Sequence, residues 1–116
     1  MFNYRAYDES QCDFYEIAPA DELPNGERLF VELDGTPIVI FNIADTFYAI
    51  RDECSHEALE IGDGDVEGLE LICPHHGARF DLRTGEALTL PAVEAIPVYP
   101  VRLREGMIEL GLPKEA

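Results

Sequence analysis

Residues 52–85 read DECSHEALEIGDGDVEGLELICPHHGARFDLRTG, and two short motifs in this stretch decide how the chain is interpreted. The first motif is Cys54-Ser55-His56, and the second is Cys73-Pro74-His75-His76-Gly77. Each motif follows an apolar run typical of a strand, so we expect each on a loop that leaves a strand. Two such loops held side by side by a sheet would offer two thiolates and two imidazoles to one centre.

The four paired side chains favour a metal centre over a disulfide framework. The chain has three cysteines, an odd number, and we assign no role to the remote Cys12. Zinc binds Cys₂His₂ sets, but structural zinc sites usually space two cysteines by about two to four residues and two histidines by about three to five. Here each cysteine is paired with a histidine, which better fits two irons, one bound by sulfur and one by nitrogen. A structural zinc module stays open as the alternative.

Outside these motifs, the chain has the pattern of an all-β domain. Short runs rich in β-branched and aromatic residues predict strands at 29–33, 37–41, 46–50, 69–72, 78–82, 98–103 and 107–110. Asp34-Gly35 and Glu105-Gly106 each predict a hairpin turn. Only residues 19–22 are weakly helical, and eight prolines disfavour a long helix. The length of 116 residues and this pattern predict a single domain built as a β-sandwich or small barrel.

Residues 52–68 interrupt the strand pattern with a long polar loop, and such loops are usually functional. Between residues 52 and 70 the chain has eight carboxylates and no lysine or arginine: Asp52, Glu53, Glu57, Glu60, Asp63, Asp65, Glu67 and Glu70. These carboxylates could dock a basic partner or simply form a solvated loop. We expect positive φ angles at Gly62, Gly64, Gly77 and Gly85.

The overall charge excludes several functions. Twenty-four acidic residues and eight basic ones give a formal charge of −16, so the chain lacks the cations that bind a phosphate backbone or an anionic membrane. No apolar run approaches the length of about 20 residues that spans a bilayer. The first ten residues do not resemble a secretory signal, so we expect a cytoplasmic protein.

The two motifs, followed by Phe80-Asp81 and Thr84-Gly85, resemble the cluster-binding part of Rieske ferredoxins. The resemblance extends over nearly the whole chain and is strongest to the stand-alone ferredoxins of bacterial aromatic-ring-hydroxylating dioxygenase systems. It implies the all-β Rieske fold, with antiparallel sheets. A small cluster-binding subdomain at about 52–85 would be inserted in a β-sandwich or barrel base formed by the rest of residues 1–116.

The resemblance also implies one [2Fe–2S] cluster per chain and assigns its ligands. Cys54 and Cys73 would hold the buried iron, and His56 and His76 the outer iron. In this family a third, proline-containing loop covers the cluster, and Thr89-Leu90-Pro91-Ala92 is the match here. We expect His75, which matches no ligand position, to be a solvated loop residue.

Two departures from respiratory Rieske proteins point to the low-potential ferredoxin branch. Leu59 and His75 stand where the respiratory type has two further cysteines that form a disulfide. Ala78 and Phe80 stand where it has hydroxyl groups that donate to the cluster sulfurs. Fewer donors stabilise an added electron less, so we expect a reduction potential on the order of −150 mV.

The resemblance implies a one-electron carrier rather than an enzyme. It would connect a flavin-containing, NAD(P)H-dependent ferredoxin reductase to a terminal ring-hydroxylating oxygenase, with both partners docking near the histidine end of the cluster. We expect it to be monomeric alone. The chain has three histidines, so beyond His56 and His76 it retains only His75, too few for a mononuclear oxygenase iron. The small Rieske-like subunit of a nitrite reductase is a further alternative with the same fold.

Overall fold

A computed structural model of the chain describes residues 5–6, 9–53, 60–74, 77–89 and 95–114. Its elements are β1 (Arg5–Ala6), η1 (Glu9–Gln11), β2 (Cys12–Pro19), η2 (Ala20–Glu22), β3 (Arg28–Leu33), β4 (Thr36–Ile43), β5 (Thr46–Arg51), β6 (Val66–Glu67), β7 (Glu70–Ile72), β8 (Arg79–Asp81), β9 (Pro97–Tyr99), β10 (Val101–Arg104) and β11 (Met107–Pro113). In the described part of the chain the only helices are η1 and η2, each a short 3₁₀ turn. The all-β prediction is therefore confirmed, and η2 lies where the sequence was weakly helical.

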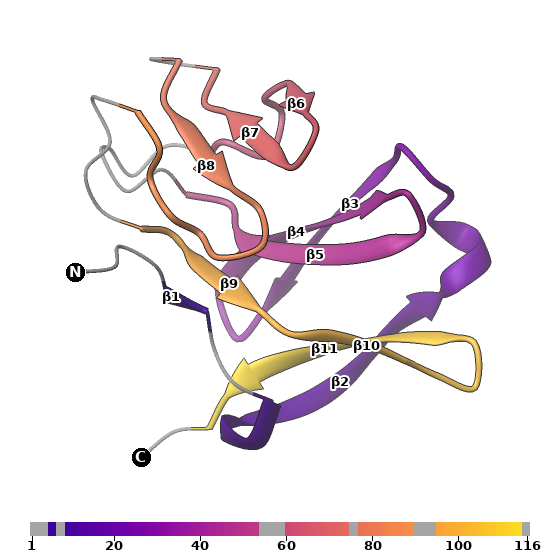
Figure 1. Cartoon of the computed structure of the whole chain (residues 1–116). Coiled ribbons are helices and arrows are strands. Elements are labelled where there is room, and N and C mark those ends of the chain that lie inside the picture. Colours follow the sequence, from indigo (N-terminus) through magenta and orange to yellow (C-terminus); the bar gives the residue numbers. More distant parts are fainter. Residues whose placement is uncertain (1–4, 7–8, 54–59, 75–76, 90–94, 115–116) are drawn as a thin grey trace.

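The strands form three sheets, which Figure 1 shows as three layers. The central sheet has the strand order β1-β9-β5-β4-β3 and is antiparallel except for the β1–β9 pair. One neighbouring sheet has the order β10-β11-β2, and the other has the order β6-β7-β8. We call the first the distal sheet and the second, which leads into the second motif, the motif sheet.

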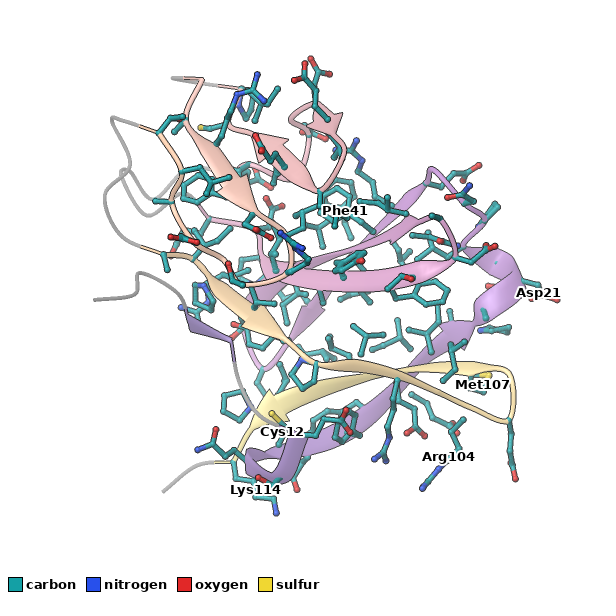
Figure 2. The ribbon with its side chains drawn as sticks, viewed as in Figure 1. Cys12, Asp21, Phe41, Arg104, Met107 and Lys114 are labelled. Carbon is teal, nitrogen blue, oxygen red and sulfur yellow. The ribbon has the colours of Figure 1, made fainter. Side chains whose placement is uncertain are left out.

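The central sheet is buried on both faces, which explains the continuous apolar run in β4. Ile38 and Ile40 pack in a distal core, which comprises Leu23, Ile38, Ile40, Ala49, Tyr99, Ile108, Leu110 and Leu112. Val39 and Phe41 point the other way, and Phe41 lies between the central and motif sheets in Figure 2. They join a motif-side core of Val39, Phe41, Ile50, Ile61, Leu71, Cys73, Ala78, Phe80, Leu82, Ile96 and Val98. Alternate side chains of one strand therefore supply two cores.

Both predicted hairpin turns are present. Asp34 and Gly35 have φ angles of 50° and 77°, and Glu105 and Gly106 have 53° and 80°. Two positive φ angles in a two-residue loop match the right-handed twist of the flanking strands. A third turn of this kind, at Ala44-Asp45, was missed because it contains no glycine and alanine rarely adopts a positive φ angle. There the Ala44 amide donates to Asn25 Oδ1 at 2.6 Å, so a tertiary contact supports the turn.

One strand prediction was wrong in detail, and strands β1, β2 and β6 were not predicted, β6 lying within the stretch 52–68 that we expected to be a loop. The run 98–103 is not one strand, because it divides at Pro100 into β9 of the central sheet and β10 of the distal sheet. Strand β2 was missed because its pairing with β11 skips Ile17, and this bulge breaks the alternation along the strand. Cys12 begins β2 and lies in the distal layer in Figure 2, whereas Cys73 follows β7.

Candidate metal centre

The second motif lies at the end of a hairpin between β7 and β8. The Cys73 amide donates to the Ala78 carbonyl at 2.7 Å, and the Gly77 amide donates to the Cys73 carbonyl at 2.9 Å. Gly77 has a φ angle of 73°, which confirms the positive value predicted there. These bonds hold Cys73 next to Gly77 and Ala78, and residues 75–76 lie outside the described residues.

The Cys73 side chain fits a buried metal ligand. It is 1% exposed and belongs to the motif-side core with Ala78 and Phe80. A thiolate is a soft ligand that suits iron–sulfur and zinc centres. Cys54, His56 and His76 lie outside the described residues, so the set of four ligands stays a prediction.

The first motif lies in a segment whose two ends are tied together by Asp52. One oxygen of its carboxylate, Oδ1, accepts hydrogen bonds from the amides of Ile61 and Gly62, at 2.8 and 2.6 Å. Asp52 directly follows the last residue of β5 and is only 4% exposed. The segment 53–60, which carries Cys54 and His56, therefore begins and ends at the same point of the structure.

A second contact joins this segment to the strand that leads to Cys73. The backbone crosses at Gly64, where a Cβ atom would lie only 1.9 Å from the Ile72 carbonyl oxygen. Beside it, the Ile72 amide donates to the Asp65 carbonyl at 2.8 Å. The polypeptide leaving the first motif thus lies directly against the residue that precedes Cys73.

The positive φ angles expected at Gly62 and Gly64 are wrong. The φ angles of both residues lie outside the left-handed region, although Gly85, with 78°, bears out the expectation. Both glycines are required for space. A Cβ at Gly62 would lie 2.5 Å from the Phe30 ring and 3.0 Å from Asp52 Oδ1.

Arg28 of β3 binds the same segment from the central sheet. Its Nη1 donates to the carbonyls of Gly62 and Gly64 at 2.5 and 2.8 Å, and its guanidinium lies 4.9 Å from the centre of the Phe41 ring. Nothing near Arg28 in the sequence indicates this contact, because its partners follow 34 and 36 residues later. Sequence reasoning therefore missed it.

The start of the predicted third loop is attached to β8. The Arg79 amide donates to Thr89 Oγ1 at 2.9 Å, and the Leu88 amide donates to the Arg79 carbonyl at 2.8 Å. Residues 87–89 therefore run beside the second motif hairpin. The covering residues Leu90, Pro91 and Ala92 lie outside the described residues.

The carboxylates of the 52–70 stretch have different roles, which corrects the expectation that all eight face a partner or solvent. Asp52 is buried and structural. Glu67 and Glu70 bind Arg79 Nη1 at 3.0 and 3.2 Å and raise the pKa of that guanidinium, chiefly through the Glu67 hydrogen bond. Glu53, Glu60, Asp63 and Asp65 are exposed. Glu57 lies outside the described residues. Among the described carboxylates of this stretch, only Asp52 is buried and so removed from a surface that a partner could meet.

Within the described residues, no helix has the length and apolarity needed to cross a bilayer.

Comparisons with known proteins show to which family the chain belongs. Residues 13–100, which contain both motifs, match the family described as "Rieske [2Fe-2S] domain". The chain is 40% identical over 98 residues to the 3-phenylpropionate/cinnamic acid dioxygenase ferredoxin subunit of Escherichia coli K12, covering 83% of this chain and 91% of that protein.

Two solved structures show the same architecture. The ferredoxin of carbazole 1,9a-dioxygenase from Nocardioides aromaticivorans superimposes with a TM-score of 0.79 at 33% identity, covering 87% of this chain and 98% of that one. A chain from a complex of reduced oxygenase and oxidised ferredoxin of a carbazole 1,9a-dioxygenase gives a TM-score of 0.80 at 26% identity, covering 89% and 96%.

Proposed function

This chain belongs to the Rieske [2Fe–2S] family, and from that premise we propose that it is the ferredoxin of an aromatic-ring-hydroxylating dioxygenase system. It would take single electrons from a flavin-containing, NAD(P)H-dependent reductase and deliver them to a terminal oxygenase. The observation that carries the proposal is the family match across both motifs, together with a relative of this type at 40% identity. The nitrite reductase alternative has less support, because that relative is a dioxygenase ferredoxin subunit.

We assign the ligands as the sequence predicted them, with Cys54 and Cys73 on one iron and His56 and His76 on the other. The cluster, when bound, supplies a centre that gains and loses one electron. The chain would shield the thiolate of Cys73 from water, because the motif-side core encloses this side chain. Ala78 and Phe80 are fully buried in that core and have no hydroxyl to donate, which supports a potential in the lower part of the Rieske range.

Both partners would dock near the histidine end of the cluster, because electron transfer needs a short distance between centres. The exposed carboxylates Glu53 and Glu60 flank the first motif in the sequence, and the exposed Asp63 and Asp65 follow it. A charge of −16 would steer a partner with a basic surface toward the protein. Turnover with the reductase should therefore slow as the salt concentration rises. We further propose a cytoplasmic monomer.

The test begins with the purified protein and its metal content. Two irons and about two sulfides per chain, with a rhombic electron paramagnetic resonance signal after dithionite reduction, would support a cluster with mixed histidine and cysteine ligands. A colourless protein with one zinc would support the alternative interaction module instead.

Neighbouring histidines provide a matched pair of variants. His76→Ala removes a proposed ligand, whereas His75→Ala removes the adjacent imidazole that matches no ligand position. We expect His76→Ala to lose the spectrum and most of the iron, and His75→Ala to retain both. Equal iron content and equal spectra in the two variants would contradict the ligand assignment.

A further inference from the structure

We propose that Arg28 and Asp52 are positioning residues that fix the first-motif segment against the second-motif hairpin. Together with the turn at residues 61–64, they form what we call the loop clasp. The inference rests on the proposed function, because it concerns how the chain holds the cluster ligands. Arg28 and Asp52 are not assigned as ligands, and neither needs to contact the cluster.

Asp52 closes the loop. Its Oδ1 accepts the amides of both Ile61 and Gly62, and the carboxylate is buried, so these bonds replace its contact with water. Hydrogen bonds to a charged acceptor are among the stronger ones in proteins. Joining the two ends of a loop lowers the conformational entropy of the residues between them, whether or not a ligand is bound.

Arg28 holds the other side of the same turn. The Gly62 amide donates to Asp52, and the Gly62 carbonyl accepts from Arg28, so the two side chains bind the two polar groups of one residue. Phe41 is the residue of β4 that pairs with Arg28 in the sheet, and the guanidinium lies over the Phe41 ring. This contact helps to fix the position of the guanidinium. The central sheet is thereby linked to the polypeptide that leaves the first motif.

The clasp also reaches the second motif. Gly64, whose carbonyl accepts the second Arg28 hydrogen bond, packs against the carbonyl of Ile72. Ile72 directly precedes Cys73, whose own amide is bonded across the hairpin to Ala78. Arg28 therefore acts at the point where the two ligand-bearing segments cross, and its loss should loosen the placement of one relative to the other.

The chain offers a matched control for Arg28. Arg102 of β10 is also half-buried, lies 3.8 Å from the centre of the Phe14 ring and binds Glu109 at 2.6 Å, but it belongs to the distal sheet. Arg28→Met and Arg102→Met remove the same group from similar surroundings. If Arg28 serves only general stability, the two variants should behave alike.

The experiment measures release of the cluster from the holoprotein in excess chelator, followed by its visible absorbance. We expect release from Arg28→Met at least about tenfold faster than from the parent, because the substitution removes both charge-assisted hydrogen bonds of Arg28 and one such bond alone is worth about that factor. Arg102→Met should release at the parental rate even if its thermal midpoint falls. Equal release rates in the two arginine variants would overturn the proposal. Arg28→Lys keeps the charge but shortens the side chain that reaches the two carbonyls and removes the planar group over the Phe41 ring, so it should also release faster, and it serves if Arg28→Met does not fold.

Hydrogen exchange across residues 60–64 gives a second readout that does not depend on the cluster. Asp52→Ala should increase exchange of this segment, whereas Asp52→Asn, which retains the Oδ1 acceptor, should have a smaller effect. Unchanged exchange in Asp52→Ala would refute the clasp. A parent protein that binds no iron would instead refute the proposed function, while the exchange measurement would still decide whether the clasp exists.

Discussion

The two faces of the central sheet are stabilised in different ways. On the distal face, β2 and β11 are strands of eight and seven residues, paired along nearly their whole length. On the motif face, β6, β7 and β8 have only two or three residues each. The distal face is therefore stabilised mainly by backbone hydrogen bonds between its long strands. The motif face depends more on hydrogen bonds from side chains to the loop backbone and on close packing at glycines. Loss of a bound metal should affect the motif face most.

The largest expected effects on stability come from two matched substitutions, each of which creates a cavity on one face of the central sheet. Leu71 and Leu110 are both fully buried, one in the motif-side core and one in the distal core. Each change to alanine should lower the free energy of unfolding by about 2–5 kcal/mol, measured by denaturant titration. Only Leu71→Ala should also speed cluster release. If Leu110→Ala speeds release as much, the two faces do not act separately.

A smaller effect is expected from alanine at two glycines. In Gly64→Ala the new methyl would meet the backbone of Ile72, and such overpacking typically costs about 1–3 kcal/mol. Gly106→Ala meets no atom within 4 Å, and its strain comes only from a φ angle of 80°. Both variants should melt earlier, but only Gly64→Ala should bind less iron per chain. Full iron content in Gly64→Ala would show that this crossing does not position the ligand segments.

The sequence predicted the hairpin turns better than it predicted the contacts that hold the two motif-bearing segments in place. Hairpin turns are local, so Asp34-Gly35 and Glu105-Gly106 could be identified from two residues each. The contacts of Arg28 join residues 34 and 36 positions apart, and no periodic pattern encodes such a pairing.

Asp52 shows how composition misleads at a functional loop. As one of eight carboxylates in a polar stretch, it was interpreted as surface charge, but the structure buries it with two amide donors. Gly62 does lie in the turn at residues 61–64, but without the positive φ angle expected there, and a Cβ atom at this position would meet Phe30 and Asp52. In both cases tertiary packing, which one sequence does not display, determines the role.

A tyrosine added on each face tests whether a missing hydroxyl keeps the potential low. Phe80 is fully buried beside Leu71 in the motif-side core, whereas Phe47 packs against the distal core. If the Phe80→Tyr hydroxyl donates to a cluster sulfur, a bond worth about 1.4 kcal/mol would raise the one-electron potential by about 60 mV. Phe47→Tyr should leave the potential unchanged in the same redox titration. If the potential does not rise in Phe80→Tyr, the missing hydroxyl at position 80 is not what keeps the potential low.

The smallest expected effect is a change in stability with pH, and it comes from an ion pair at the end of the motif sheet. Asp81 of β8 binds Arg83 through both carboxylate oxygens, at 3.2 and 3.0 Å, and this side-chain hydrogen bonding is the main cause that lowers the pKa of Asp81. A carboxyl whose pKa is lower in the folded state stabilises the fold above its unfolded pKa, near about 4, and loses that contribution as the pH falls through the folded pKa.

Arg83→Gln should therefore reduce stability most at neutral pH, and its difference from the parent should vanish in acid once Asp81 is protonated. Arg104→Gln removes the same charge from β10 of the distal sheet and serves as the control. Thermal unfolding of the three proteins from pH 7 downward measures both differences. A deficit in Arg83→Gln that persists at the acid end would mean that Arg83 acts through packing, because its ion pair with Asp81 no longer exists there.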